Sequence, residues 1–511
     1  MKFIVKLFPE ISIKSKPVRK QLVSRLRDNI GKILAQVSPD IKVVSQWDRI
    51  DVDLAKAVSS MEVPEEQKTS QTVSQTVSQK ACQKEPSGLI GLVADMLQRI
   101  PGIANILLVE QHDLVDFDQV TNLAIDYYAQ EIAGKSFVVR VRRAGRHSFT
   151  STQMEQYVGG GLLAHTSADR VDLRNPEVTI NIEVRGNDLF LVKKRYEGLG
   201  GFPLGSQEPV LSLISGGFDS VAASYLTMRR GLKTHFCFFN LGGDAHEIGV
   251  KQVALYLWER YGASHRVKFV SVPFEEVVAE ILKSVHHSQM GVVLKRLMLR
   301  AASEVAKELK LHALVTGESV AQVSSQTLPN LAVIDRATDT LVLRPLITMD
   351  KLDIIRLCAQ IGAEEFAANM PEYCGVISDR PTTRARLGKV LAEEEKFDFA
   401  VLDKALAERK MISVDEVMES TVVAGVVEVV STPAIGDVIV DIRHPDERQK
   451  SPLKLTNNRI IHLPFYELAS KASEFDPDKR YLLYCKKGTM SRLHASHLNR
   501  LGQNVLVYRQ G

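Results

Sequence analysis

The chain has 511 residues, of which 45% are hydrophobic and 25% charged, with a formal net charge of +4 at pH 7. At roughly 100 to 200 residues per domain this length predicts three or four domains, and the composition is ordinary for a globular protein. No apolar run reaches the roughly 18 residues that cross a bilayer, and Lys6 and Pro9 interrupt the segment where a secretory signal would be apolar. We therefore expect a cytoplasmic protein with no membrane partner.

Residues 1–58 have the pattern of a small α+β unit. Alternating apolar residues predict a strand over residues 2–8, helical spacing predicts a helix over 18–37, and strand character returns over 41–54. Residues 1–32 contain nine Lys or Arg and two acids, which makes this segment a candidate surface for a polyanion.

Residues 59–88 lose this periodicity and contain the tandem repeat QTVSQTVS. A stretch rich in Gln, Ser and Thr buries too little apolar surface to order itself. We expect a disordered insertion here, and we expect no role for Cys82 within it.

Regular patterns return over residues 89–196. The predicted elements are a helix over 89–100, a strand over 104–110, a helix around 120–133 and a hairpin over 178–196 that turns at Gly186-Asn187. Together they predict a second α+β unit.

A basic segment without any acidic residue, residues 135–147, lies within this unit. Its cations are Lys135, Arg140, Arg142, Arg143 and Arg146. Strand alternation would turn Arg140 and Arg142 outward from a core. A solvated strand edge protected by charge has the same pattern. Five basic groups without a carboxylate favour nucleic acid, and we take them as candidate contacts to it.

A Gly/Pro-rich linker over residues 197–209 leads into residues 205–400, where strands and helices alternate as in a doubly wound α/β fold. The predicted strands are 210–214, 235–239, 267–272 and 313–316. Residues 401–432 are expected to connect this domain to a compact α/β module over residues 433–511.

The segment LSLISGGFDS, residues 211–220, has the pattern of a phosphate-binding loop. It lies between an apolar strand and a helix, so the backbone N–H groups of Ser215, Gly216 and Gly217 are expected near a helix N-terminus, where anions bind. A Walker loop would carry a lysine. Asp219 stands in the loop instead, and a carboxylate beside a triphosphate makes sense chiefly through Mg²⁺. We therefore do not expect transfer of the γ-phosphoryl group.

The hexapeptide SGGFDS resembles the PP-loop of ATP pyrophosphatases. These enzymes split ATP into AMP and pyrophosphate and leave AMP on an oxygen atom. The resemblance implies that an adenylated carbonyl oxygen becomes a leaving group that a nucleophile replaces.

Five downstream segments resemble one PP-loop family in particular, the tRNA 4-thiouridine synthetases. They are FNLGGDAH, VVLKRLMLR, TGESVAQVSSQTLPNL, RPLITMDKLDII and MPEYCGVISDRPTT. The resemblance covers nearly the whole chain and implies a multidomain α/β and α+β protein. Its implied domains are ferredoxin-like (1–58), THUMP and tRNA-binding (89–196), PP-loop ATP pyrophosphatase (205–400) and rhodanese-like (433–511).

The same resemblance implies roles for individual residues. Asp219 and Lys351 would act in adenylation, with Mg²⁺ accompanying ATP and Asp219 as its candidate ligand. Beyond the loop residues Ser215, Gly216, Gly217 and Ser220, the implied ATP contacts are Leu213, Ile214, Lys295, Gly317 and Gln326. From the residues alone, Lys351 is one basic group at a helix start, and Lys295 and Arg296 interrupt an apolar segment.

Cys485 follows an apolar strand in LLYCKKGTMS, and a helix is expected to begin near Ser491. Loop amides, the helix start, Lys486 and Lys487 would favour the thiolate; a buried structural cysteine is the alternative. The segments VIVDIRHPDE and IIHLPFYEL resemble rhodanese strands, which implies that Cys485 carries a persulfide. Many rhodaneses have Arg five residues after this cysteine, where this chain has Met490. We therefore expect sulfur from a PLP-dependent cysteine desulfurase rather than from thiosulfate.

The remaining cysteines divide into two kinds. Cys374 lies in the polar, turn-like segment PEYCGV, and the family resemblance pairs it with Cys485 in a transient disulfide. Cys237 lies inside the strand HFCFF and Cys358 at helical spacing from Ile355, so both are expected in the core. No C-x-x-C pair indicates zinc.

These patterns lead to one hypothesis. The chain adenylates O4 of a tRNA uridine, position 8 by resemblance, and replaces this oxygen with sulfur from Cys485 to give 4-thiouridine. The expected partners are tRNA, a cysteine desulfurase and the sulfur-carrier protein of thiamine thiazole synthesis, and a homodimer is compatible with the sequence. The alternatives are a 2-thiouridine synthase, a persulfide relay protein without tRNA chemistry, an amide-forming ligase and a non-catalytic tRNA-binding protein.

Overall fold

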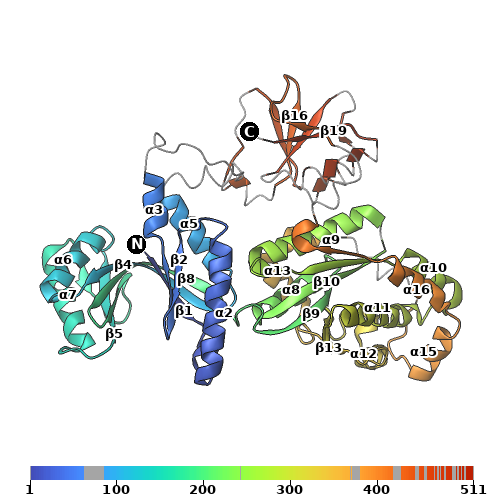
Figure 1. Ribbon diagram of the computed structural model, residues 1–511, viewed down its shortest axis with the longest axis horizontal. Coiled ribbons are helices and arrows are strands. Elements are labelled where there is room, and N and C mark those ends of the chain that lie inside the picture. The colour runs from blue at the N-terminus through green and yellow to red at the C-terminus, as the bar shows by residue number, and fades with distance from the viewer. Residues whose placement is uncertain are drawn as a thin grey trace. The chain divides into compact units, whose positions relative to one another are not determined.

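The computed structural model divides into two compact units, Met1–Gln71 with Cys82–Pro203, and Thr72–Ala81 with Leu204–Gly511 (Figure 1). The described residues are 2–62, 86–241, 243–368, 370, 380–417, 427–443, 448–449, 451–453, 457–464, 467–468, 471, 474–476, 479–485, 491, 494–495, 498–499 and 502–509. The insertion expected over residues 59–88 falls mostly outside these ranges. Within them, no helix is both long enough and apolar enough to cross a bilayer.

The described part of the first unit is built on one eight-stranded sheet with the order β2-β3-β1-β4-β8-β7-β5-β6. Its strands are β1 (Lys2–Leu7), β2 (Lys42–Ser45), β3 (Arg49–Asp53), β4 (Ile103–Asp113), β5 (Ser136–Ala144), β6 (Arg170–Val171), β7 (Val178–Arg185) and β8 (Asp188–Gly200). Neighbours are antiparallel, except that β5 runs parallel to both β7 and β6. The predicted hairpin is confirmed, since β7 and β8 pair around Gly186, whose φ is +59°.

Two large hydrophobic cores and one smaller cluster lie against this sheet in the described part of the unit. Its helices are α1 (Pro9–Ser12), α2 (Lys16–Leu34), α3 (Ala55–Glu62), α5 (Pro86–Leu97), α6 (Phe117–Tyr128) and α7 (Ser151–His165). One face of α2, including Leu22, Leu26 and Ile30, packs in the first core, and each such side chain contributes about 1.5–3 kcal/mol by burial. Residues of α5 and the start of β4 complete that core, whereas α6, α7, β5 and β7 form the second.

The described part of the second unit begins with a six-stranded sheet of order β13-β12-β9-β10-β11-β14. Its strands are β9 (Gln207–Leu213), β10 (Leu232–Asn240), β11 (Lys268–Pro273), β12 (Ala313–Val315), β13 (Leu341–Leu343) and β14 (Lys410–Ser413). All run parallel except β14, which is antiparallel to β11. The doubly wound α/β fold and its four predicted strands are confirmed.

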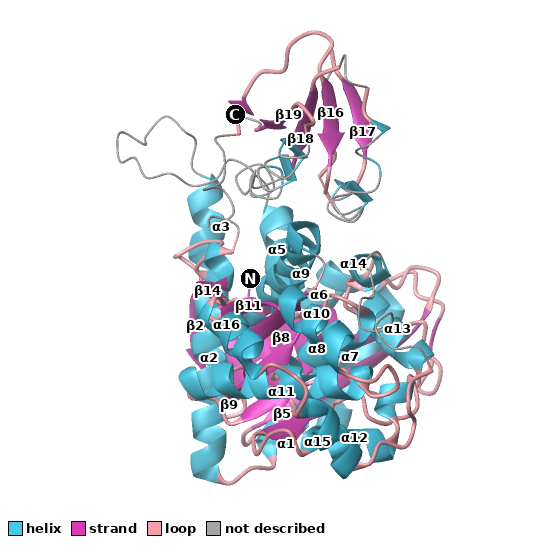
Figure 2. Cartoon of the chain, turned by 90° about the vertical axis from the view of Figure 1, so that its right-hand side faces the viewer, coloured by secondary structure: helices cyan, strands magenta, loops and turns pink. Residues whose placement is uncertain are grey.

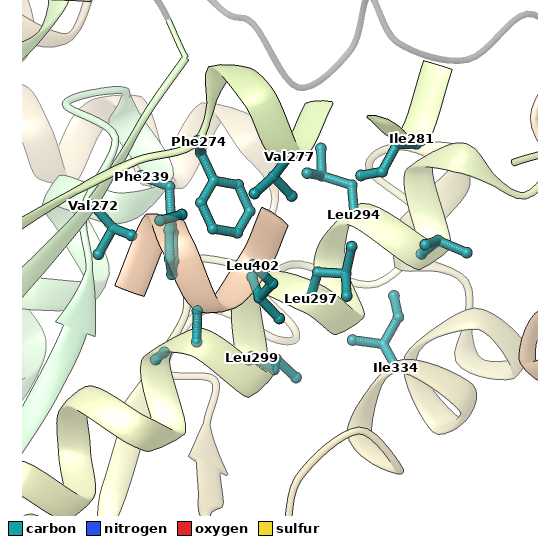
Figure 3. Packing of buried hydrophobic residues seen from close by; sticks show 14 of the residues in the cluster. Phe239, Val272, Phe274, Val277, Ile281, Leu294, Leu297, Leu299, Ile334 and Leu402 are labelled. Atoms are coloured by element: carbon teal, nitrogen blue, oxygen red, sulfur yellow. The ribbon is translucent and has the colours of Figure 1, made fainter. Parts of the chain in front are cut away.

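Helices cover both faces of this sheet. They are α8 (Phe218–Arg229), α9 (Gly243–Leu257), α10 (Glu275–Ser284), α11 (Met290–Glu308), α12 (Leu328–Asp335), α13 (Lys351–Gln360), α14 (Glu364–Ala368), α15 (Leu387–Glu394) and α16 (Phe399–Ala407). In Figure 1, α8, α9 and α13 lie on one side of the strands, and α11 and α12 on the other. Phe274, Leu294, Leu297 and Leu402 meet in the core on the second side (Figure 3).

Part of the segment that the sequence presented as a connector belongs to this domain. Helix α16 contacts α10, and β14 extends the sheet by pairing Ile412 with Phe269. The apolar residues of α16, Leu402 and Ala405, are buried in the same core. Residues 399–413 are therefore an ordered part of this domain, although most of them were expected in the connector.

The last sheet, as far as it is described, has five parallel strands in the order β15-β19-β18-β16-β17. They are β15 (Val429–Val430), β16 (Val438–Asp441), β17 (Arg459–His462), β18 (Tyr481–Tyr484) and β19 (Val505–Tyr508). Figure 2 shows β16, β17, β18 and β19 side by side. Every residue of β16, β18 and β19 is buried, as expected for parallel strands covered on both faces. The predicted compact α/β module is confirmed.

Candidate functional site

The phosphate-loop pattern folds as a strand, a tight loop and a helix. Strand β9 ends at Leu213, Gly216 has a φ of +83°, and Gly217 is the N-cap of α8. The Ser220 hydroxyl stabilises the loop, because it donates to Gly217 O at 3.0 Å and accepts from Ser215 N at 3.2 Å. The N–H of Ser215 is therefore engaged inside the loop. The N–H groups of the first turn of α8 have no intrahelical acceptor and are the ones suited to an anion.

The topology of the sheet places this loop at a switch point. From β9 the chain continues to β10 and β11 on one side, and returns to β12 and β13 on the other. In open α/β sheets, ligands bind where neighbouring strands diverge in this way, at their carboxyl ends. Residues 214–217 after β9 and residues 316–326 after β12 therefore share one edge of the sheet.

Gly317 is where the segment after β12 touches the first turn of α8. A Cβ atom at this position would lie 2.5 Å from the carbonyl carbon of Asp219 and 2.8 Å from the amide nitrogen of Ser220. Both atoms belong to the backbone of α8 and cannot move aside independently. Only glycine fits here without a shift of that backbone, and the predicted contact of Gly317 with ATP remains a prediction.

Gly317→Ala is expected to lower the free energy of unfolding by about 1–3 kcal/mol, because the new methyl group overpacks two backbone segments. Thermal unfolding followed by circular dichroism measures the effect. The matched control is Gly388→Ala in α15, where nothing lies within 4 Å of the new Cβ. An equal loss in both variants would show that the contact with Asp219 is not the cause.

Two residues that the sequence places far apart meet beside the loop. Lys351 Nζ lies 2.8 Å from Asp219 Oδ1, so the first residue of α13 pairs with the first turn of α8. The second carboxylate oxygen of Asp219 accepts a hydrogen bond of 2.7 Å from Gln322 Nε2. Asp219 is thereby fixed from two sides. Gln322 is not among the residues that the sequence patterns predict.

Lys295 belongs to a second ionic group at the same strand ends. Its Nζ lies 2.7 Å from Glu318 Oε1, and Arg344 Nε lies 2.7 Å from Glu318 Oε2. Burial raises the pKa of Glu318, but the Coulomb attraction of Lys295 and Arg344 outweighs it and holds this pKa below its ordinary value. Glu318 is therefore a carboxylate that fixes both cations. Its place directly after Gly317 at the switch point is the signal that could have identified it.

The neighbouring Arg296 has a structural role. It is 1% exposed and forms an ion pair of 2.6 Å with the buried Glu394, and its Nη1 also donates to Val333 O. These bonds tie α11 to α12 and α15. Of the two basic residues that interrupt the apolar segment, only Lys295 extends to the candidate site.

Gln326 is buried at the end of the segment after β12. Its backbone oxygen accepts a hydrogen bond from Ala321 N, which closes a short loop. Its side-chain oxygen Oε1 is buried and has no hydrogen-bond partner in the described part of the chain. A buried acceptor of this kind is suited to a ligand that brings a donor.

Cys485 lies directly after β18, in the middle of the last sheet, as predicted. Its Sγ accepts a hydrogen bond of 3.3 Å from the backbone N–H of Ser491. An N–H directed at sulfur favours the thiolate. Lys486, Lys487 and Cys374 lie outside the described residues, so the predicted effects of the two lysines and the predicted disulfide remain predictions.

The end of β16 contacts the residue that precedes Cys485 on the neighbouring strand. Asp441 and Arg443 form a buried ion pair of 2.7 Å, and the Arg443 guanidinium lies 4.8 Å from the centre of the Tyr484 ring. Tyr484 is the residue before Cys485. The patterns of the sequence did not single out this pair.

Cys237 and Cys358 are core residues, as predicted. Both side chains are fully buried. Burial raises the pKa of each thiol to about 12. Neither is a thiolate at neutral pH, so neither is suited to nucleophilic chemistry.

The basic segment forms β5 and the turn after it. Val139 and Val141 are buried while Arg140 and Arg142 are exposed, which confirms the predicted alternation. The alternative reading, a strand edge protected by charge, does not account for the whole basic segment, because β5 pairs with β7 along its length and is not a free edge on that side. Among the described residues, none of its five cations forms an ion pair with a carboxylate. They are Lys135, Arg140, Arg142, Arg143 and Arg146.

Three family profiles match the chain in succession. The profile described as "Thiamine biosynthesis protein (ThiI)" matches residues 205–399. The THUMP domain profile matches residues 115–192, and the rhodanese-like domain profile matches residues 428–511. The first of these contains the loop, Gly317 and Lys351, and the last contains Cys485.

Full-length relatives carry a single name. The tRNA sulfurtransferase of Marinobacter nauticus is 50% identical over 509 residues, which is 99% of each chain. The tRNA sulfurtransferase of Shewanella amazonensis is 51% identical over 511 residues, which is 100% of each chain.

A solved structure shares the fold. It is a 4-thiouridine synthetase in complex with RNA and with bound ATP, and it is 24% identical with a TM-score of 0.65. The match covers 81% of this chain and 99% of the other. At this level of identity the likeness concerns the arrangement of the elements.

Proposed function

Because this chain belongs to the tRNA sulfurtransferase family of the ThiI type, we propose that it converts a tRNA uridine to 4-thiouridine in an ATP-dependent reaction. The uridine is position 8 by resemblance, and the sulfur comes from a persulfide on Cys485. The observation that carries the proposal is the meeting of Asp219 and Lys351 at the first turn of α8, beside a loop suited to phosphate. The RNA and ATP bound by the solved structure of the same fold agree with it.

The proposed ATP site lies at the switch point of the second unit. The strand end and the loop would lie beside the phosphates, and the first turn of α8 would hold them through its backbone N–H groups. Lys295, fixed by Glu318, adds a cation at the same edge. The complete proposed set is Leu213, Ile214, Ser215, Gly216, Gly217, Ser220, Lys295, Gly317 and Gln326.

Magnesium is expected to arrive with ATP, because proteins usually bind it through one or two carboxylates together with substrate phosphates and water. Asp219 fits as one such ligand. Each of its oxygens accepts one hydrogen bond, from Lys351 and from Gln322, and keeps further acceptor capacity. The bound cation would neutralise phosphate charge.

In the first proposed step, O4 of the uridine forms a bond to the α-phosphorus of ATP. The bond from that phosphorus to pyrophosphate breaks, and the N3 proton of the uracil leaves to water. Lys351, oriented by Asp219, would stabilise the negative charge that develops on the phosphate oxygens. The product is an O4-adenylated uridine whose AMP is a good leaving group.

In the second step, the terminal sulfur of the Cys485 persulfide forms a bond to C4 of the base, and the C4–O4 bond to AMP breaks. The Cys374 thiolate then attacks Sγ of Cys485, which releases 4-thiouridine and leaves a Cys374–Cys485 disulfide. A dithiol reductant restores both thiols. A PLP-dependent cysteine desulfurase is the proposed source of the persulfide sulfur.

The five cations on and around β5 are the proposed contacts to tRNA. Replacing Arg140 and Arg142 together by Gln should weaken tRNA binding and make the plot of log affinity against log salt less steep by about 0.7–0.9 per lost phosphate contact. Filter binding at several salt concentrations measures this. The control removes two cations that already pair with carboxylates on their own helices, Lys283→Gln with Lys307→Gln. An unchanged slope in the Arg140/Arg142 variant would exclude these residues as phosphate contacts.

A second role is proposed from the description of the family as a thiamine biosynthesis protein. The Cys485 persulfide would also supply sulfur to the sulfur-carrier protein of thiazole synthesis. This role needs the last sheet and no tRNA.

Nucleoside mass spectrometry tests the main proposal. Unmodified tRNA is incubated with the protein, ATP, Mg²⁺, cysteine and a cysteine desulfurase. Appearance of 4-thiouridine only with ATP supports the proposal, whereas 2-thiouridine would assign the reaction to the other carbonyl of the base. If Cys485 takes up sulfur but no thiolated base appears, the carrier role is the one that remains.

A further inference from the structure

The side chain of Gln322 is satisfied at one end only. Its Nε2 donates a hydrogen bond of 2.7 Å to Asp219 Oδ2. Its oxygen Oε1 is buried and finds no hydrogen-bond partner among the residues that the structure describes. A carboxylate accepts hydrogen bonds and donates none, so Asp219 determines which end of the carboxamide faces it. The unpaired group next to Asp219 is therefore an acceptor.

The chain bears two costs to hold Gln322 in this position. A buried acceptor without a donor lowers stability. The preceding residue, Ala321, has a φ of 64°, in the left-handed region that is unfavourable for a residue with a side chain. Unpaired buried groups and strained residues concentrate at sites where they serve a ligand. The oxygen is therefore suited to a donor that the reaction brings to it.

We propose that Oε1 of Gln322 accepts a hydrogen bond from the N3–H group of the target uracil. The inference rests on the proposed function, because it takes O4 of a uridine to react beside Asp219 and Lys351. N3 and O4 are both bonded to C4 of the base. An acceptor held against Asp219 can therefore meet N3–H while O4 lies at the phosphate. Binding has to uncover Oε1, and it then supplies the donor that the free protein lacks.

This hydrogen bond would act on both rate and specificity. As O4 forms its bond to phosphorus, electron density moves from N3 toward O4, and N3–H becomes a stronger donor until its proton leaves to water. A fixed acceptor therefore stabilises the transition state more than the ground state. Cytosine has a lone pair at N3 in place of the proton. In cytosine, N3 and Gln322 Oε1 would both be acceptors and would repel each other. The hydrogen bond to Asp219 prevents the carboxamide from rotating to place its donor, Nε2, against N3.

The amino group of adenine is the other donor that ATP and tRNA bring to the site. Gln326 offers a second buried oxygen without a partner among the described residues, and it is already a proposed ATP contact. Gln322 is assigned to uracil because its partner is Asp219, one of the two residues proposed to act where O4 reacts. The experiment separates the two donors.

The test compares the full-length wild type with Gln322→Met, which keeps the length of the side chain and removes both polar groups. Binding of two tRNA transcripts, with uridine or cytidine at the thiolated position, is measured with a non-hydrolysable ATP analogue present. The wild type should bind the uridine transcript at least about tenfold more tightly, and the variant should bind both within about twofold. Any effect of cytidine on tRNA folding is common to both proteins and cancels between them. Turnover for pyrophosphate release should also fall by about tenfold or more in the variant.

The control is Gln360→Met at the exposed end of α13, which should retain the wild-type discrimination. If Gln322→Met keeps the wild-type preference for uridine, the proposal is overturned. It is also overturned if the variant instead loses the preference for ATP over purine riboside triphosphate, which lacks the amino group. Should the variant unfold, Gln322→Asn, which is one methylene shorter, is tested in the same way and judged by the same outcomes. A wild type that releases no pyrophosphate with the uridine transcript would overturn the proposed function itself.

Discussion

Replacing Lys351 by Met is expected to reduce tRNA-dependent pyrophosphate release by about 100- to 1,000-fold, the usual cost of removing a group that stabilises charge in a transition state. Lys351 is held 2.8 Å from Asp219 at the first turn of α8, so it is positioned before ATP binds. Its loss also leaves the Asp219 carboxylate without its cation beside the phosphates. Release of pyrophosphate in the presence of tRNA and ATP measures the effect directly.

The fold should survive this substitution. The side chains of Lys351 and Asp219 are 38% and 24% exposed, and ion pairs at such exposure contribute about 1 kcal/mol or less to stability. Lys307→Met removes a lysine that is 69% exposed on α11 and should release pyrophosphate at nearly the wild-type rate. Activity of Lys351→Met within a few-fold of this control would remove Lys351 from the proposed mechanism.

The sequence predicted the parts of the site that are local. An apolar strand, two glycines and the start of a helix are contiguous, and their geometry follows from backbone preferences and the partial charge of a helix end. Cys485 after a buried strand is likewise contiguous. For this reason the loop at Gly216 and the position of Cys485 at the end of β18 could be predicted without the structure.

The contacts between distant segments could not be predicted in this way. Gln322 reaches Asp219 only because β12 lies next to β9, a pairing that no local pattern encodes. The same pairing brings Gly317 against the backbone of α8 and places Glu318 between two cations. In the sequence, Gln322 and Glu318 are ordinary polar residues in a loop.

The limits of the domains were also hard to predict, because they too depend on contacts between segments that are distant in the sequence. The first core takes α5 and the start of β4 from beyond the insertion, so that residues on both sides of it share one sheet. In the second unit, β14 adds its four residues to a sheet whose other strands end far earlier in the chain. Charged residues and glycines indicate which parts of a segment face solvent. Whether the segment belongs to a domain depends on the apolar residues that it buries in the core of that domain.

Cys485→Ser is expected to abolish formation of 4-thiouridine, a loss of at least about a thousandfold, because a hydroxyl cannot carry a persulfide and loss of a covalent nucleophile has effects of this size or larger. Pyrophosphate release should stay within about twofold of wild type, since Cys485 follows a strand of the last sheet, whereas Asp219 and Lys351 lie on helices of the six-stranded sheet, and independent sites contribute independently. The two products, thiolated nucleoside and pyrophosphate, are measured in the same reaction.

The pairing of these two outcomes is what makes Cys485→Ser informative. An unfolded protein would lose both products, whereas loss of the persulfide alone stops the reaction at adenylated tRNA. Cys82→Ser is the matched control, since the sequence gives that cysteine no role, and it should form both products at the wild-type rate. Continued thiolation by Cys485→Ser would mean that sulfur reaches C4 without this residue. The hydrogen bond of 3.3 Å from the Ser491 N–H to Cys485 Sγ would then have a structural role and no role in sulfur transfer.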